Sequence, residues 1–216
     1  MTVNMNIIKK MSAAAVLLAV LLSLLSCNSA AGGNYSVEEV TGVVLADSDT
    51  FAMLNEMLGM LTFDSAEIPE FDNMKDAIGL FRDSVLNYMS GTSYAKYAGN
   101  SALIEEVNKK YPNLNVIEVI PADEFESVMY RYFGGSVKIT HAGSRLFRYL
   151  DAADAYIPVT APISGGVDIT LKEVLETENT YRLTFTCSTD EFAVDYYALV
   201  IKRDDGSCYF SALFKK

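Results

Sequence analysis

The spacing of apolar residues changes once along this chain, at Gly134-Gly135. Before the two glycines, apolar side chains recur at steps of three and four residues, which is the period of an amphipathic helix. After them, short apolar segments are separated by turn-forming residues, which is typical of antiparallel strands. The sequence therefore predicts an α+β fold, in which N-terminal helices pack on one face of a C-terminal antiparallel β-sheet.

Four helices are predicted on the N-terminal side of the glycines. The first begins with Asp49 as its N-cap, the second covers residues 71–89, and the third covers residues 101–111, before Pro112. The fourth begins at Asp123, because Asp123 followed by Glu126 three residues later is typical of a capping box. Short strands are also expected within residues 35–45 and 116–120.

Seven strands are predicted after the glycines, over residues 137–140, 145–150, 156–159, 167–175, 180–187, 196–203 and 207–214. Asp205-Gly206 is a two-residue hairpin signal, and it places Arg203 opposite Cys208. This register predicts an apolar sheet face built from the pairs Ile201/Phe210, Leu199/Ala212 and Tyr197/Phe214, and from Leu183 and Phe185 opposite Ile201 and Leu199.

The same register separates two of the three cysteines. It places Cys187 beside Tyr197 and Cys208 beside Arg203, six residues apart along the sheet and two strands across it, which is roughly 22 Å. A disulfide needs Cα atoms within about 7 Å of each other. We therefore expect two free, inward-facing cysteines that pack as small apolar residues.

The N-terminus has the layout of a secretory signal. Lys9 and Lys10 precede an apolar run over residues 13–26, and Cys27 follows the run directly. The run is shorter than the roughly 18 residues that a spanning helix needs. We expect a signal peptide over residues 1–26, a flexible tether over 27–35 and a single α+β domain over 36–216, mainly helical in 36–111 and with one helix plus the sheet in 112–216.

The tetrad Leu24-Leu25-Ser26-Cys27 resembles the lipobox of bacterial lipoproteins. The resemblance implies that Cys27 becomes the first mature residue and carries a diacylglyceryl group on its sulfur. It also implies an extracytoplasmic protein, anchored by lipid at the cell surface or outer membrane, since Asn28 follows the cysteine where aspartate would suggest retention at an inner membrane. A simply secreted protein and a retained transmembrane anchor are the alternatives. From residue 123 onward the expected architecture is similar in outline to cystatin-like or nuclear-transport-factor-like cones.

The charge of the chain is acidic and uneven. The formal net charge is −11, and it becomes −13 once Lys9 and Lys10 are removed with the signal. Residues 33–90 alone carry eleven acidic residues against Lys75 and Arg82. Because such a surface repels phosphate backbones, we expect no nucleic-acid partner. The expected partners are the membrane, through the lipid anchor, and an envelope protein or small ligand.

Catalytic motifs are weak in this sequence. His141 is the only histidine and is expected to be an exposed loop residue. Ser93-Tyr94-Ala95-Lys96 matches the S-x-x-K motif of penicillin-binding proteins and class A β-lactamases, but the companion S-D-N and K-T-G motifs are absent. With one histidine and two separated cysteines, we expect no metal and no cofactor.

The leading functional prediction is a non-catalytic binding module for a protein, wall or lipid ligand. Its candidate ligand-binding residues are four tyrosines that could line a recess between helix 123–133 and the sheet: Tyr130, Tyr132, Tyr149 and Tyr156. No catalytic residue is assigned. The alternative is a small envelope hydrolase that uses Ser93 and Lys96, or a carboxylate pair such as Asp151 and Asp154.

Overall fold

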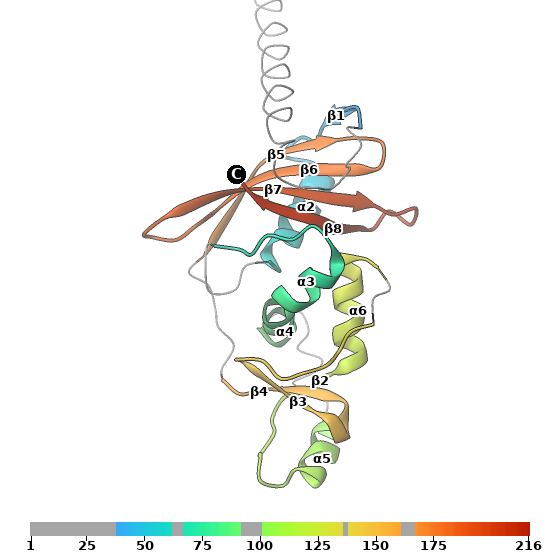
Figure 1. The fold of residues 1–216 in the computed structure, drawn as a ribbon, viewed down its shortest axis with the longest axis vertical. Helices are drawn as coiled ribbons and strands as arrows, with labels where there is room; N and C mark the ends of the chain where they lie inside the picture. The colour runs from blue at the N-terminus through green and yellow to red at the C-terminus, as the bar shows by residue number, and fades with distance from the viewer. Residues whose placement is uncertain (1–37, 62–66, 92–100, 136–137, 161–166) are drawn as a thin grey trace, which may run out of the picture. The chain divides into compact units, whose positions relative to one another are not determined.

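The computed structural model describes residues 38–61, 67–91, 101–135, 138–160 and 167–216, which belong to one compact unit, Glu38–Lys216. Within these residues the fold is α+β, with five α-helices, one short 3-10 helix and eight strands (Figure 1). The helices are α2 (Asp49–Gly59), α3 (Met74–Leu80), α4 (Arg82–Gly91), α5 (Ser101–Lys110) and α6 (Ala122–Phe133), and the 3-10 helix is η2 (Asp151–Ala153).

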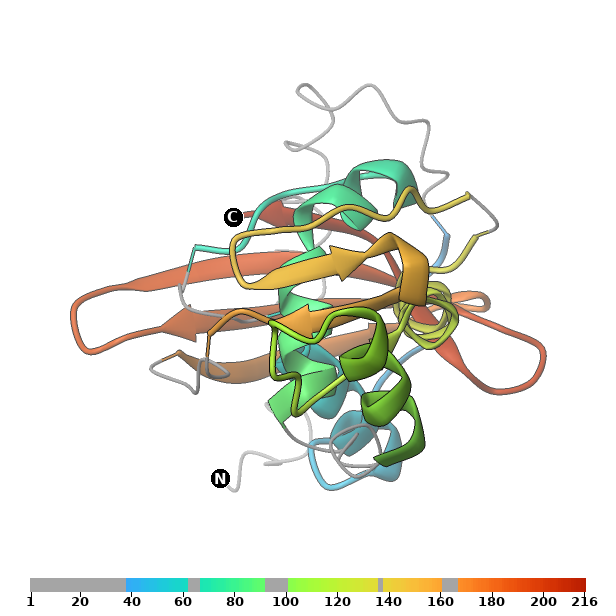
Figure 2. The ribbon, with the colours of Figure 1, turned by 90° about the horizontal axis from the view of Figure 1, so that it is seen from below.

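The strands form two antiparallel sheets, whereas the sequence predicted one. The larger sheet has the order β1-β5-β6-β7-β8 and the smaller has the order β2-β4-β3. Figure 2 shows the side of the molecule on which the smaller sheet lies. Its edge strand β2 precedes α6 in the chain, whereas β3 and β4 follow α6, so the order of elements along the chain does not indicate that β2 belongs to this sheet. The strands are β1 (Gly42–Val43), β2 (Ile120–Pro121), β3 (Phe147–Leu150), β4 (Ala155–Pro158), β5 (Asp168–Glu176), β6 (Thr180–Ser188), β7 (Ala193–Lys202) and β8 (Cys208–Lys215). The predicted strand at 137–140 is not formed in its described residues, 138–140.

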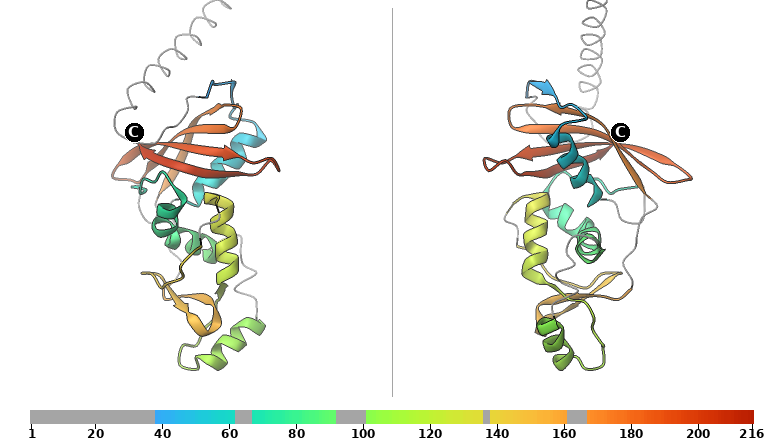
Figure 3. Two further views of the ribbon diagram at one scale, coloured as in Figure 1. Left: turned by 45° about the vertical axis from the view of Figure 1, so that its right-hand side comes forward. Right: turned by 180° about the vertical axis from the view of Figure 1, so that it is seen from behind.

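The main apolar core lies between the larger sheet and the helices. Helices α2 and α6 lie against the same face of this sheet (Figure 3). The inward-facing sheet residues include Leu183, Phe185, Cys187, Tyr196, Ala198 and Val200, all of them fully buried. Phe133 of α6 packs on Phe71 and Phe81, with ring centroids 5.6 and 5.2 Å away. The expected helical layer over one sheet face is therefore present.

Strand β4 of the smaller sheet is buried on both faces, as its run of apolar residues favours. Ile120, Phe147 and Tyr156 belong to the main core. Leu150, Ala155 and Ile157 belong to a second cluster with Val107 of α5. The smaller sheet is thus packed between the main core and α5.

Two predicted helix boundaries are wrong, one because of tertiary packing and one because of a local cap. The segment 71–89 forms two helices, because the backbone leaves helical values at Phe81 (φ −105°, ψ 11°). The Phe81 ring is fully buried between Phe71 and Phe133, so burial of this ring outweighs continuation of the helical period. At α2 the N-cap is Ser48 rather than Asp49, and its hydroxyl accepts from the Phe51 amide at 3.2 Å.

The predicted capping box of α6 is also wrong. The helix begins at Ala122 with Pro121 as its N-cap, and no side chain caps it. Pro121 belongs to β2, and its pairing with Ala155 of β4 sets the point where the helix starts. Asp123 instead accepts from the Glu124 amide at 2.9 Å, so Glu126 is available for a different contact.

The other end of α6 is held by a distant arginine. Arg203 donates to the carbonyl oxygens of Tyr130 at 2.8 Å and Arg131 at 3.3 Å. Its guanidinium carbon also lies 4.6 Å from the centroid of the Tyr209 ring. A cation is favourable at a helix C-terminus, where carbonyl groups have no helical partner.

The hairpin register differs from the predicted one by a single bulge. The pairs Leu199/Ala212 and Tyr197/Phe214 are confirmed, but Ser211 is an extra residue, and beyond it Val200 pairs with Phe210 and Lys202 with Cys208. The turn uses three residues, 204–206, with Gly206 at φ +82° and the Arg203 amide bonded to the Ser207 carbonyl. The predicted pairs Arg203/Cys208 and Ile201/Phe210 are therefore wrong.

The predicted apolar face is also wrong in β7. Leu183 pairs with Ala198 and Phe185 with Tyr196, so even-numbered residues of β7 face the core and Ile201, Leu199 and Tyr197 lie on the opposite face. Two buried free cysteines are confirmed. Cys187 lies opposite Val194, and Cys208 lies opposite Lys202 eight residues along the same strand. Burial raises the pKa of the Cys187 thiol to about 12.

Gly134 is a position where the fold is sensitive to one added methyl group. Its φ is +70°, and an added Cβ would lie 2.5 Å from the Tyr209 ring. We expect Gly134→Ala to lower the free energy of unfolding by about 2 to 4 kcal/mol, from backbone strain and overpacking together. Chemical denaturation measures the loss.

Gly206→Ala is the matched control, since Gly206 has a similar φ of +82° but no atom within 4 Å of an added Cβ. It should lose only the strain contribution of about 1 to 2 kcal/mol. Equal losses in both variants would contradict the role given to the Tyr209 contact.

Candidate functional site

His141 is the centre of a polar cluster, and its predicted exposure is wrong. The side chain is 16% exposed. Its Nδ1 lies 2.9 Å from the hydroxyl of Tyr156 on β4, and its Nε2 lies 3.1 Å from Oε1 of Glu126 on α6. The imidazole therefore links helix α6 to the smaller sheet.

The partners of His141 determine its tautomer. An ionised carboxylate only accepts hydrogen bonds, so the ring hydrogen of a neutral imidazole lies on Nε2, facing Glu126. Nδ1 is then the acceptor for the Tyr156 hydroxyl. Burial raises the pKa of Tyr156 to about 12, so this hydroxyl keeps its hydrogen at neutral pH.

Aromatic rings surround the imidazole. Tyr149 of β3 stacks on it, with centroids 5.2 Å apart and planes 21° apart. Phe125 and Tyr156 meet it edge-on at 6.3 and 5.8 Å. The Tyr149 hydroxyl donates to Oδ1 of Asp154 at 2.6 Å, and this bond raises the pKa of Tyr149. The cluster is therefore held on two sides by rings that are themselves fixed.

The backbone around His141 is held by Arg82 of α4. The guanidinium donates to the carbonyl oxygen of Thr140 at 2.9 Å and to that of Ala142 at 3.4 Å. These carbonyls flank the histidine, so Arg82 fixes the loop that presents the ring. Four separate elements, α4, α6, β3 and β4, position this one side chain.

The geometry favours binding over proton transfer. Both imidazole nitrogens already have protein partners, and Tyr156 is fully buried. A ligand could take a proton from His141 only by replacing one of these bonds. Glu126, which is 32% exposed, and half-buried Tyr149 offer a carboxylate and an aromatic ring at fixed positions, which suits recognition by hydrogen bonding and stacking.

The structure brings two of the four predicted tyrosines together at His141. Tyr149 and Tyr156 meet at His141, with ring centroids 5.1 Å apart. Tyr132 is 6% exposed and its hydroxyl donates to that of Tyr88 on α4 at 3.4 Å. Tyr130 is half-buried, and burial and the Glu126 carboxylate raise its pKa. Ligand binding by these residues stays a prediction.

Sequence reasoning missed Glu126, His141, Phe125 and Arg82 as members of this cluster. Glu126 and His141 are fifteen residues apart, and no periodic signal joins a helix residue to a loop residue at that distance. Cys27, Ser93 and Lys96 lie outside the described residues. Asp154, one of the proposed carboxylate pair, is the acceptor for Tyr149.

A shallow open recess of 570 Å³ lies at the β7–β8 turn, away from this cluster, and Lys202 and Arg203 are among its lining residues. Both cations are engaged within the fold: Lys202 with Glu176 and Arg203 with the end of α6. In the part of the chain that the structure describes, no three His, Cys, Asp or Glu side chains are grouped to hold a metal ion.

No protein-family model matches the chain, and no curated protein or solved structure matches it either. Among the described helices, none combines the length and the apolar character that crossing a membrane requires. The function is therefore argued from the residues themselves.

Removal of one hydroxyl tests whether the His141 cluster supports the fold. Tyr156→Phe leaves Nδ1 of His141 without its donor in a half-buried position, so we expect the free energy of unfolding to fall by about 1 to 3 kcal/mol. Tyr149→Phe is the matched control, because its hydroxyl bonds the exposed Asp154, and it should lose less than about 1 kcal/mol. Denaturant unfolding compares the two; a larger loss in Tyr149→Phe would contradict this order.

Proposed function

We propose that this chain is an exported lipoprotein, anchored by lipid at Cys27, whose domain over residues 36–216 is a non-catalytic binding module in the cell envelope. The observation that carries the proposal is the tetrad Leu24-Leu25-Ser26-Cys27, placed directly at the end of an apolar run that follows Lys9 and Lys10. Residues 27–35 then serve as the tether between the lipid and the domain.

The physics of such an anchor supports stable attachment. Each buried methylene contributes about 0.8 kcal/mol, so one acyl chain binds only reversibly and two or three chains hold the protein at the membrane. Asn28 after the cysteine favours the outer membrane or cell surface over retention at an inner membrane. The partners of the domain are then a protein, wall or lipid ligand of the envelope.

The candidate binding surface is the exposed side of the His141 cluster. Tyr149 is stacked on the imidazole and bonded to Asp154, so little side-chain freedom remains to be lost when a ligand binds. Glu126 supplies a partly exposed carboxylate beside it. This combination favours a neutral or cationic ligand with a flat or apolar face.

The state of the described nucleophilic groups also supports binding over catalysis. Burial raises the pKa of both the Cys187 and the Cys208 thiol, which disfavours the reactive thiolate at neutral pH. The histidine nitrogens are engaged as described. The hydrolase that would use Ser93 and Lys96 remains the alternative proposal, tested by substituting either residue with alanine and assaying hydrolysis.

The anchor is tested by metabolic labelling with a clickable fatty acid in a bacterial host that processes lipoproteins. We expect the full chain to incorporate label and to fractionate with membranes, and Cys27→Ala to lose both properties. Cys208→Ala is the control, because Cys208 is buried in the folded domain, and it should label like the parent. Label retained by Cys27→Ala would contradict the proposal.

The binding surface is tested through its single histidine, whose imidazole proton gives one resolved NMR signal. The signal is followed while wall fragments, lipid vesicles and peptides are added in turn. We expect one class of probe to shift it saturably, and Tyr149→Ala to weaken that binding by about tenfold, the loss of roughly 1.4 kcal/mol of stacking. Phe192→Ala is the control, since Phe192 is exposed in the β6–β7 turn. A signal that no probe moves would contradict binding at this surface.

A further inference from the structure

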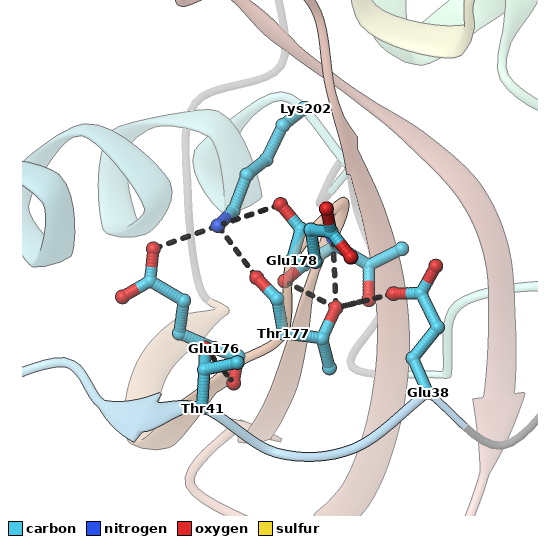
Figure 4. Close-up of polar contacts among 7 residues, drawn as sticks. Glu38, Thr41, Glu176, Thr177, Glu178 and Lys202 are labelled. Carbon is cyan, nitrogen blue, oxygen red and sulfur yellow. Dashed lines mark hydrogen bonds and ion pairs between the residues drawn. The ribbon is translucent and has the colours of Figure 1, made fainter.

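A polar cluster at the β5–β6 turn fastens residues 38–44, the first described residues of the chain, to the edge of the larger sheet (Figure 4). The Glu38 carboxylate accepts from Thr177 Oγ1 at 2.5 Å and from Asn179 Nδ2 at 3.2 Å. The backbone carbonyl oxygen of Glu38 accepts from the Arg182 guanidinium at 2.9 Å. These hydrogen bonds hold the pKa of the Glu38 carboxyl below its usual value.

Lys202 of β7 fixes the conformation of the β5–β6 turn by hydrogen bonds. Its ammonium group donates to Glu176 Oε1 and to the Thr177 carbonyl, both at 2.7 Å, and to the Glu178 carbonyl at 3.5 Å (Figure 4). The ammonium also lies 4.5 Å from the centroid of the Tyr181 ring. The turn is therefore fixed by the sheet itself, with or without Glu38.

Beyond Glu38, the segment is attached by few backbone bonds. The Thr41 amide donates to the Glu176 carbonyl at 2.8 Å, and the Val44 amide donates to the Val174 carbonyl at 3.0 Å. Strand β1 has only two residues. Val43 is 57% exposed, and the apolar contact of the segment with the main core is made by half-buried Val44. Polar contacts exchange for water at a small net free energy, whereas apolar burial does not.

The fold after this segment is independently supported. The Ser48 hydroxyl caps α2 and donates to the Leu45 carbonyl at 2.7 Å, so the turn before the helix keeps its own contacts. The first fully buried side chain of the chain's described part is Leu54, inside α2. Release of residues 38–44 would therefore remove the half-buried Val44 from the main core but leave its fully buried side chains in place.

We propose that residues 38–44 are a releasable strap, which opens and closes as a unit and sets how far the domain can move from its anchor. This proposal rests on the lipid anchor proposed above. With the strap closed, the chain from Cys27 to Glu38 spans at most about 40 Å, and with the strap open the chain from Cys27 to Leu45 spans at most about 65 Å. Opening also frees the β5 backbone at Val174 and Glu176 for another extended segment.

The test is residue-resolved amide hydrogen exchange on the full chain in detergent. In Glu38→Ala the Thr41 and Val44 amides should exchange about tenfold faster, because the carboxylate contacts that hold the strap are lost. The amides of Ala198 and Val200 in β7 should not change, since the sheet stays folded. Glu39→Ala is the matched control, an exposed neighbouring glutamate, and should exchange like the parent. Glu38→Gln, which keeps an acceptor oxygen, should lie between the two.

Two results would overturn the strap. Unchanged exchange at Thr41 and Val44 in Glu38→Ala would show that the polar cluster at the β5–β6 turn does not hold the segment. If the Thr41 and Val44 amides exchange no faster than the β7 amides of Ala198 and Val200, the segment opens only when the whole domain unfolds and is not a separate unit. The same measurement in a Cys27→Ala background separates the two proposals, because strap opening does not depend on whether Cys27 carries lipid.

Discussion

Burial of helix α6 from two sides is the constraint on which the rest of this structure depends. At its C-terminal end Phe133 packs on Phe71 and Phe81 beneath the larger sheet, and near its start Phe125 packs on Tyr156 of the smaller sheet. A helix that is apolar toward two neighbours can join two sheets into one core. Its two ends are then held by polar contacts from elsewhere in the chain, Arg203 at the C-terminus and His141 through Glu126 in the first turns.

Polar clusters of this kind are also the features on which the functional proposals are built. The His141 cluster unites side chains from α4, α6, β3 and β4 in a half-buried position, where each hydrogen bond is worth more than at the surface and each missing partner is expensive. The polar cluster at the β5–β6 turn also joins side chains from separate segments, since Lys202 fixes the turn in which Thr177 donates to Glu38. One cluster offers a rigid, partly exposed binding surface, and the other fastens the segment through which the proposed tether enters the domain.

Much of the fold could be predicted from the sequence. The α+β class, the positions of three of the five α-helices (α2, α5 and α6) within a few residues and the strands β5 to β8 follow from apolar spacing and turn residues, which are local signals. The predictions that failed concern pairing between strands, which the local pattern does not specify. The division into two sheets depends on β2 pairing with β4 across α6, and the face of β7 that is buried depends on its pairing with β6, where Leu183 lies opposite Ala198 rather than Ile201. A shift by an odd number of residues exchanges the faces of a strand, so this shift inverts the predicted face.

The candidate site was predictable only in part. The sequence predicts Tyr149 and Tyr156 as candidate binding residues, but it places Glu126 in a capping box and His141 in an exposed loop. Local sequence determined which segments are helical or extended, that Cys187 and Cys208 lie too far apart to pair, and the signal-like N-terminus, because each depends on residues close together in the chain. Only the tertiary structure decided that Glu126 turns to His141, that Arg82 holds the loop and that Glu38 docks on Thr177. Those contacts join residues 15, 58 and 139 positions apart, and partners at such separations are chosen by packing and burial rather than by local pattern.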